Sequence, residues 1–309
     1  MRPRIGITLG DCAGIGPEIV DLALKSGRVS DLAEYVVIGQ RLNCKPGKPS
    51  IETARAAAAA LEEAVTRARR GELQAVVTGP VHKARMYEAG FEFPGQTEFF
   101  AERCGVKNFA MCLTDGKLTV ALVTTHIPLS DVPRALKQSE IVRVGRLLAD
   151  FMQRRKRQQH LNALSIQVRI AVCGLNPHAG ESGKIGREEI EIISPAVAEL
   201  ESKMQNAKSE IFVGPVSPDT VFHRAIEGEF DAVLCMYHDQ GLIPLKLHGF
   251  HNGVNTTLGL PFPRTSPDHG TAFEIAGKGI ARPDSMIAAI NLAVELADKQ
   301  KVSKETKKS

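Results

Sequence analysis

Short apolar runs alternate with longer helical patterns along the chain. Seven runs rich in β-branched residues end at or near a glycine or a polar turn: 4–10, 35–39, 75–79, 119–125, 168–174, 211–214 and 232–237. Runs of this length and composition are typical of buried strands, and helical patterns separate most of them. The pattern therefore predicts an α/β sheet.

The clearest predicted helix extends from Ile51 to Arg70. Its alanine, glutamate and arginine residues favour helix, and Gly71 supplies a stop. Further helices are predicted near 136–157, 187–206 and 284–299. Candidate site residues come from both halves of the chain, so we expect residues 1–300 to form a single catalytic unit of two interleaved α/β subdomains. Residues 301–309 are predicted to be a basic, disordered tail.

Composition argues against several classes of protein. The net charge of +4 is modest, and no Trp and only three Tyr are present to build an aromatic platform for nucleic acid. No stretch approaches the roughly 20 apolar residues of a membrane span, and the N-terminal segment lacks the apolar core of a signal peptide. The six cysteines lack C-x-x-C spacing, which favours reduced thiols. We expect a cytoplasmic protein that binds neither nucleic acid nor membranes.

Three histidines each lie just beyond a predicted strand: His126, His178 and His238. In an open α/β sheet, residues beyond the carboxyl ends of the strands line the ligand crevice. Three imidazoles would suit zinc, cobalt or another divalent ion, with positions left for substrate oxygens. A single histidine at a strand end more commonly satisfies a loop hydrogen bond, so spacing alone leaves both interpretations open.

A glycine-rich turn, GDCAGIGPEIV, follows the first predicted strand. Gly14 and Gly16 permit a tight turn, and Pro17 and Glu18 suit the first turn of a helix. The spacing is not that of a dinucleotide fingerprint, and a glutamate there would repel a pyrophosphate. We therefore interpret this segment as a tight connection between strand and helix.

A better anion site lies in one loop-rich stretch that contains Lys246, Asn255 and Arg264. An ammonium, an amide and a forked guanidinium can together bind a phosphate or a carboxylate, although all three are also ordinary surface residues. Farther along, Glu274 is placed to accept hydrogen bonds from an adenosine ribose, which would favour NAD over NADP. The alternative is an exposed glutamate at a helix entry.

Eight motifs along the chain together define one enzyme family. They are GDCAGIGPE, TGPVHK, GQTEF, TTHIPL, GLNPHAGE, MYHDQG, GVNTTLGLPFPRTSPDHGTA and AGKG. In this order they resemble the 4-hydroxythreonine-4-phosphate dehydrogenase family over nearly the whole chain. Two motifs, GDCAGIGPE and HGTAFEIAGKGIARP, also resemble those of isocitrate and isopropylmalate dehydrogenases. The resemblance implies their fold, with two α/β subdomains around a central cleft.

The resemblance also implies an activity and a set of site residues. The family consists of NAD-dependent, decarboxylating dehydrogenases of pyridoxine biosynthesis that require a divalent metal such as zinc, cobalt or magnesium. His126, His178 and His238 are implied as the metal ligands, in a cleft completed by the second subunit of a homodimer. Contacts to a small phosphorylated substrate are implied for Gln96, Thr97, Lys246, Asn255 and Arg264, and the NAD side for His269, Gly270, Thr271 and Glu274.

The chain departs from the family pattern at three places. Gln96 stands where the family usually has a histidine, and an amide can donate and accept hydrogen bonds but cannot become cationic. The segment that contains CKPGKPS is shorter than usual, and Cys12 stands where proline is usual. The change at Gln96 makes the identity of the substrate less secure than the type of reaction.

Our mechanistic hypothesis is that the metal lowers the pKa of the substrate hydroxyl so that hydride leaves for NAD. 4-Phosphohydroxy-L-threonine would become a β-keto acid that decarboxylates to 3-amino-2-oxopropyl phosphate. Asp239 is the first candidate for the general base, ahead of Asp219 and Lys246, and it is alternatively an orienter of His238. Threonate or erythronate 4-phosphate and a cyclic dihydrodiol carboxylate are alternative substrates. A metallohydrolase and a non-catalytic metabolite-binding scaffold are more remote alternatives.

Overall fold

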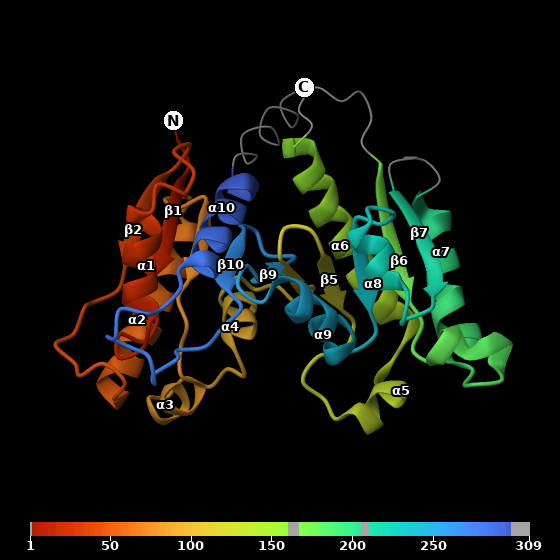
Figure 1. Ribbon diagram of the computed structural model, residues 1–309, viewed down its shortest axis with the longest axis horizontal. Helices are drawn as coiled ribbons and strands as arrows, with labels where there is room; N and C mark the ends of the chain where they lie inside the picture. The colour runs from red at the N-terminus through yellow and green to blue at the C-terminus, as the bar shows by residue number, and fades with distance from the viewer. Residues whose placement is uncertain (1, 160–166, 205–209, 298–309) are drawn as a thin grey trace. The chain divides into compact units, whose positions relative to one another are not determined.

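The computed structural model describes residues 2–159, 167–204 and 210–297, so the predicted tail at 301–309 lies outside the described residues. The chain divides into two compact units, which Figure 1 shows as an α/β arrangement each. The first unit combines Met1–Lys107 with His251–Ser309, and the second is Asn108–Phe250. The two ends of the chain therefore build one unit, and its middle builds the other.

In the first unit, the residues that the structure describes form a five-stranded run of sheet. Its strands, in spatial order, are β2 (Glu34–Ile38), β1 (Arg4–Thr8), β3 (Ala75–Thr78), β10 (Arg264–Pro267) and β9 (Val254–Leu258). All pairs are parallel except β9 with β10. Its helices are α1 (Gly16–Lys25), α2 (Ile51–Arg69), α3 (Lys83–Glu88), α4 (Gln96–Arg103) and α10 (Asp284–Ala297). The carboxyl ends of β1, β3 and β10 therefore share one edge.

The described residues of the second unit also form five strands. Their spatial order is β4 (Ala110–Thr114), β5 (Thr119–Leu122), β8 (Ala232–Cys235), β6 (Val168–Cys173) and β7 (Glu210–Val216). Only β4 and β5 pair antiparallel. The helical segments are η1 (Leu129–Asp131), α5 (Val132–Ala135), α6 (Gln138–Gln159), η2 (Pro177–Gly183), η3 (Glu189–Ile193), α7 (Ser194–Met204), α8 (Val221–Ile226) and α9 (His238–Gly249). As a result, β5, β8 and β6 end side by side.

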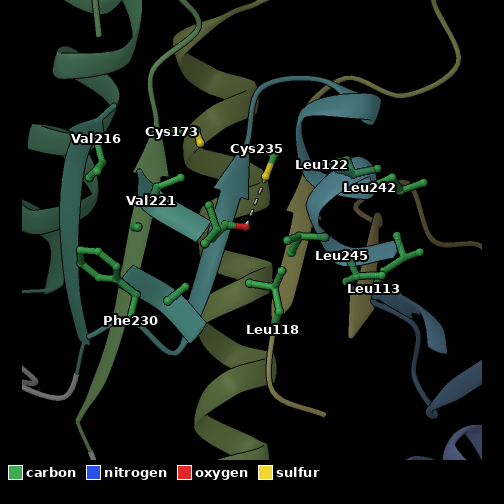
Figure 2. Close-up of a cluster of buried hydrophobic side chains, with 14 residues drawn as sticks. Leu113, Leu118, Leu122, Cys173, Val216, Val221, Phe230, Cys235, Leu242 and Leu245 are labelled. Atoms are coloured by element: carbon green, nitrogen blue, oxygen red, sulfur yellow. Dashed lines mark hydrogen bonds between the residues drawn. The ribbon is translucent and has the colours of Figure 1, made fainter. Parts of the chain in front are cut away.

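A hydrophobic core holds these three strand ends in place (Figure 2). Leu242 and Leu245 of α9 lie beside Leu122 of β5 and Leu113 of β4, and all four side chains are buried. Full burial of one leucine contributes roughly 1.5–3 kcal/mol to folding. The core therefore fixes α9, and with it His238, against the sheet.

The predicted α/β architecture is confirmed, as are all seven predicted strands. The helix predicted at 51–70 ends at Arg69, and those predicted near 136–157 and 284–299 occur as α6 and α10. The segment at 187–206 begins as a π-helical turn, η3, before α7. Sequence patterns missed β4, β9 and β10. The last two, VNTTL and RTSP, are too short and polar to show the apolar signature of a strand.

Within the part of the chain that the structure describes, no helix is both long and apolar enough to cross a membrane. The long helix α2 instead packs an alanine-rich face against the rest of the first unit, with Ala54, Ala57 and Leu61 buried. Its start is fixed by a capping box, in which Ser50 and Thr53 exchange hydrogen bonds between side chain and backbone.

Ser50→Ala should lower the free energy of unfolding by about 1 kcal/mol, because the backbone N–H of Thr53 loses its side-chain acceptor. Urea titration followed by circular dichroism measures this change. Ser50→Asp is the matched control and should stay near the parent value, because aspartate caps as well as serine. An equal loss of unfolding free energy in both variants would show that the loss does not come from the cap.

Candidate functional site

Two of the three predicted metal-ligating histidines are neighbours in the second unit. His126 follows β5, and His238 begins α9 directly after β8, so the parallel pairing of β5 with β8 brings them together. Their ring centroids lie 5.6 Å apart. Nδ1 of His238 lies 2.7 Å from Oδ1 of Asp239. A carboxylate at Nδ1 holds that nitrogen protonated and leaves Nε2 as the nitrogen that can bind a metal.

His178 follows β6, the strand beyond β8, and makes a different contact. Its Nδ1 lies 3.8 Å from Oδ2 of Asp219. The Ser217 hydroxyl donates a 2.6 Å hydrogen bond to Asp219 and lowers the pKa of that carboxyl, and His178 acts in the same direction. Asp219 is therefore a carboxylate at neutral pH.

The metal site is only partly assembled. Two imidazoles are adjacent, with their rings tilted by 45°, but across the described ranges no three His, Cys, Asp or Glu side chains are grouped to hold a metal ion. His126 and His238 fit the imidazole preference of zinc and similar ions, whereas His178 does not complete the set. The three-histidine ligand set therefore stays a prediction.

The backbone around His178 is left-handed. Residues 178–182 all have positive φ, and four of them are not glycine: His178, Ala179, Glu181 and Ser182. For these residues a left-handed conformation costs on the order of 1–2 kcal/mol each. Strain of this kind persists only where the surroundings enforce it, and it gathers at functional sites.

Glu189 holds the segment that leads into this turn, and sequence analysis missed it. Its side chain is 2% exposed. Oε1 accepts 2.7 Å hydrogen bonds from the backbone N–H groups of Leu175 and Asn176, and Oε2 accepts from Nδ2 of Asn176 at 2.9 Å. The sequence offered no signal, because a glutamate in a charged run such as REEIE is usually exposed.

In the first unit, the structure places Arg264 at the centre of a polar cradle. The guanidinium is buried and donates from Nη2 to Oγ1 of Thr78 at 2.6 Å and to Oε1 of Gln96 at 2.8 Å. Nη1 donates to Oγ1 of Thr257 at 3.4 Å, and that hydroxyl lies 3.3 Å from the hydroxyl of Thr97. The predicted substrate residues Gln96, Thr97 and Arg264 thus lie together.

The charge of this cradle is not balanced by these partners. All three oxygens that accept from Arg264 are neutral, and burial lowers its pKa to about 10, partly opposed by Glu98. Arg264 is therefore still cationic at neutral pH. Among the described side chains, buried Nε of Arg264 and buried Oδ1 of Asn255 have no hydrogen-bond partner. A buried cation with an unused donor is suited to bind an anion such as phosphate.

Lys246, the remaining predicted substrate residue, lies on α9 in the second unit. The predicted substrate residues therefore come from both units of the chain, whereas the predicted metal ligands all belong to the second unit and the predicted cofactor residues all belong to the first.

The predicted cofactor residues follow β10 and contact the glycine turn. The backbone N–H of Ile15 donates to the carbonyl of Thr271 at 2.9 Å, and a Cβ on Gly14 would lie only 2.7 Å from that carbonyl oxygen. Nε2 of His269 is buried and has no partner among the described residues, whereas Glu274 is exposed. The loop from His269 to Glu274 therefore has one buried ring nitrogen that no described residue satisfies.

The glycine turn itself is a close-packed connection, as predicted. A Cβ on Gly16 would lie 2.0 Å from the carbonyl oxygen of Leu9, and α1 begins at this residue with Pro17 in its first turn. Two neighbours of the turn were not among the predicted site residues. Asp11, after β1, and His82, after β3, each bury a side-chain atom that finds no partner within the described part of the chain.

Comparison with known proteins decides the family. The family model described as "Pyridoxal phosphate biosynthetic protein PdxA" matches residues 18–293. This chain belongs to that family. It is 43% identical to the 4-hydroxythreonine-4-phosphate dehydrogenase of Aquifex aeolicus, over 97% of this chain and 100% of that protein. The predicted resemblance is confirmed, and the protein is an enzyme of the NAD-dependent dehydrogenase type found in this family.

Solved structures agree with this assignment. The 4-hydroxythreonine-4-phosphate dehydrogenase of Klebsiella pneumoniae is similar with a TM-score of 0.79 and 35% identity, covering 96% of this chain and 100% of that one. A terephthalate 1,2-cis-dihydrodiol dehydrogenase from Burkholderia xenovorans gives 0.66 and 25%, covering 95% and 98%. An isocitrate dehydrogenase from Methylococcus capsulatus gives 0.52 and 17%, covering 99% and 89%, and shows the predicted fold alone.

Glu189→Gln should lower the free energy of unfolding by about 1–3 kcal/mol. The amide oxygen would be a weaker, uncharged acceptor for the backbone N–H groups of Leu175 and Asn176, and the amide NH2 would replace the oxygen that accepts from Nδ2 of Asn176. Hydrogen exchange of the amides at 175–183 should rise in parallel. Glu191→Gln is the control, because Glu191 forms an exposed ion pair with Arg187 and should change stability little. Unchanged exchange in Glu189→Gln would show that another group holds the turn.

Proposed function

We propose that this enzyme oxidises 4-phosphohydroxy-L-threonine with NAD and that the resulting β-keto acid decarboxylates to 3-amino-2-oxopropyl phosphate. The observation that supports this most directly is the buried cation of Arg264, whose hydrogen-bonded partners are all neutral. A phosphate would supply the missing negative charge and an acceptor for Nε.

The residues of the cradle have distinct roles in this proposal. Arg264 binds phosphate oxygens, and Asn255 and the Thr97 hydroxyl orient the substrate beside it. Gln96 holds the guanidinium with its oxygen while its Nε2 donates to the carbonyl of Gly79 at 3.1 Å. Lys246 adds a second positive charge toward the substrate, a role that rests on the family resemblance.

The substrate hydroxyl would be oxidised beside the three histidines. We propose that His126, His178 and His238 hold one divalent metal, zinc or a similar ion, and that NAD binds along the loop from His269 to Glu274. When bound, the metal would lower the pKa of the substrate hydroxyl, and NAD would accept the hydride. Support comes from the adjacent rings of His126 and His238 and from the buried, unpartnered Nε2 of His269.

Asp239 is the proposed catalytic carboxylate. Its 2.7 Å contact with His238 supports a positioning role more directly than a role as base, because that oxygen already accepts from the imidazole. Asp219 is the alternative base. It lies 3.8 Å from Nδ1 of His178, and the Ser217 hydrogen bond that lowers its pKa keeps it ionised while weakening it as a base.

We further propose a cytoplasmic homodimer with an active site shared between subunits. An apolar stripe on α9 supports a partner surface: Ile243, Leu247 and Phe250 are 65%, 87% and 72% exposed, and their spacing places them on one helical face. All six cysteines are free thiols in the structure, which fits a reducing compartment.

The alternative substrates keep the same reaction. Gln96 cannot become cationic, so it does not demand a phosphate dianion as a histidine in the family pattern would. The similarity to a structure named as a dihydrodiol dehydrogenase favours a cyclic dihydrodiol carboxylate as the second candidate. Threonate or erythronate 4-phosphate would satisfy Arg264 equally well.

Purified enzyme with zinc and NAD should form NADH fastest on 4-phosphohydroxy-L-threonine, ahead of erythronate 4-phosphate and a dihydrodiol carboxylate. Absorbance of NADH reports the rate, and a chelator should abolish it. Activity on the dihydrodiol alone would replace the proposed substrate.

His126→Ala and His178→Ala should both lose bound zinc, measured by elemental analysis, without loss of folded structure. Full zinc content in His178→Ala would remove that residue from the ligand set.

Gln96→His should make substrate binding depend on pH. A protonated imidazole adds a donor for the phosphate, so the ratio of the variant's KM to the parent's KM should fall by about tenfold between pH 8 and pH 6. Steady-state kinetics at several pH values measure this ratio. Gln96→Glu is the control of opposite sign: its carboxylate would pair with Arg264 and raise KM at every pH. A constant ratio for Gln96→His would show that this side chain does not meet the phosphate.

A further inference from the structure

Two cysteines that are distant in sequence lie in contact in the first unit. Sγ of Cys12 and Sγ of Cys44 are 3.5 Å apart, and both side chains are half-buried. Cys12 lies in the glycine turn after β1, and Cys44 lies in the segment between β2 and α2 that has neither helix nor strand. Cys12 and the CKPGKPS segment are also two places where the resemblance implies a departure from the family pattern.

Both loops touch the predicted NAD loop. Next to Cys12, a Cβ on Gly14 would meet the carbonyl of Thr271. Near Cys44, the backbone N–H of Gly47 donates to the carbonyl of Ala13 at 2.8 Å, and a Cβ on Gly47 would lie 2.7 Å from the carbonyl of Phe273. The cysteine pair therefore lies between two segments that pack against residues 271–273.

We propose that Cys12 and Cys44 form a reversible disulfide that weakens NAD binding when a small-molecule disulfide oxidises the enzyme. The NAD part of this inference rests on the proposed function. A disulfide requires the sulfur atoms to approach to about 2.05 Å, so they must move together by about 1.5 Å. Both residues lie in loops, and such a movement pulls on Ala13 and Gly47 and, through them, on the loop that holds Thr271.

The chemistry is an ordinary thiol–disulfide exchange. The Cys44 thiolate attacks one sulfur of the oxidant, whose S–S bond breaks and releases one small thiol. The Cys12 thiolate then attacks Sγ of Cys44, forms the protein disulfide and releases the second small thiol. The protein pair loses two electrons and two protons, and the oxidant gains them.

The environment of Cys12 suits the second role in this sequence. Burial, with Cys44 acting in the same direction, raises the pKa of Cys12 to about 11. A thiol that is seldom ionised is a poor first attacker but can still react with a sulfur held beside it. Cys104, the residue that follows α4, is also half-buried and also has its pKa raised by burial, which makes it a matched control thiol.

The test uses the full chain, reduced or treated with oxidised glutathione. Oxidation should lower the intact mass by about 2 Da, and a non-reducing peptide map should link the peptides of Cys12 and Cys44. Calorimetry with NAD should show an affinity at least about fivefold weaker in the oxidised enzyme, restored by dithiothreitol. Cys44→Ser should lose both responses, and Cys104→Ser should keep them.

Two results would overturn the proposal: no linked peptide under excess oxidant, or a linked peptide with the same NAD affinity in both states. NAD binding by the reduced enzyme distinguishes these two results from a failure of the proposed function. If reduced enzyme does not bind NAD at all, the cofactor assignment is wrong, whereas the mass measurement still decides whether the cysteines pair.

Discussion

Parallel strand pairing is the constraint on which the candidate site depends. Neighbouring parallel strands end at one edge, so residues that follow them are brought together however far apart they are in sequence. In the second unit this places His126 beside His238, after β5 and β8. In the first unit the same rule gathers the turns after β1, β3 and β10. The antiparallel strand β9 adds Asn255, which pairs with Ser266 near the end of β10.

The buried guanidinium of Arg264 makes this edge of the first unit's sheet suited to an anion. A guanidinium removed from water is costly unless its donors and its charge are satisfied. Threonine hydroxyls and the Gln96 amide satisfy the donors in part, but none of them supplies a negative charge. The anionic ligand proposed above would meet the energetic need that remains, and its binding affinity and the stability of the cradle would then be coupled through one side chain.

Sequence patterns predicted the strands whose apolar runs are continuous, because burial on both faces of a parallel sheet demands such runs. They missed β9 and β10, since threonine, asparagine and arginine there serve the polar cradle rather than a core. The motifs marked Gln96 and Arg264 as site residues. Their hydrogen bond joins residues 168 positions apart, however, and only the fold reveals it. The left-handed turn at His178 was also invisible, because glycine alone signals positive φ and four of its residues are not glycine.

The nested order of the two units has a consequence for synthesis of the protein. The second unit is one continuous segment, whereas the first needs β9 and β10 from beyond residue 250. During translation, β3 must wait with an unpaired edge until β10 emerges from the ribosome. The middle of the chain is therefore free to fold first as a unit, while the strands made earliest complete their sheet last. Nascent chains halted before Arg264 would expose this edge to chaperones or to other nascent chains.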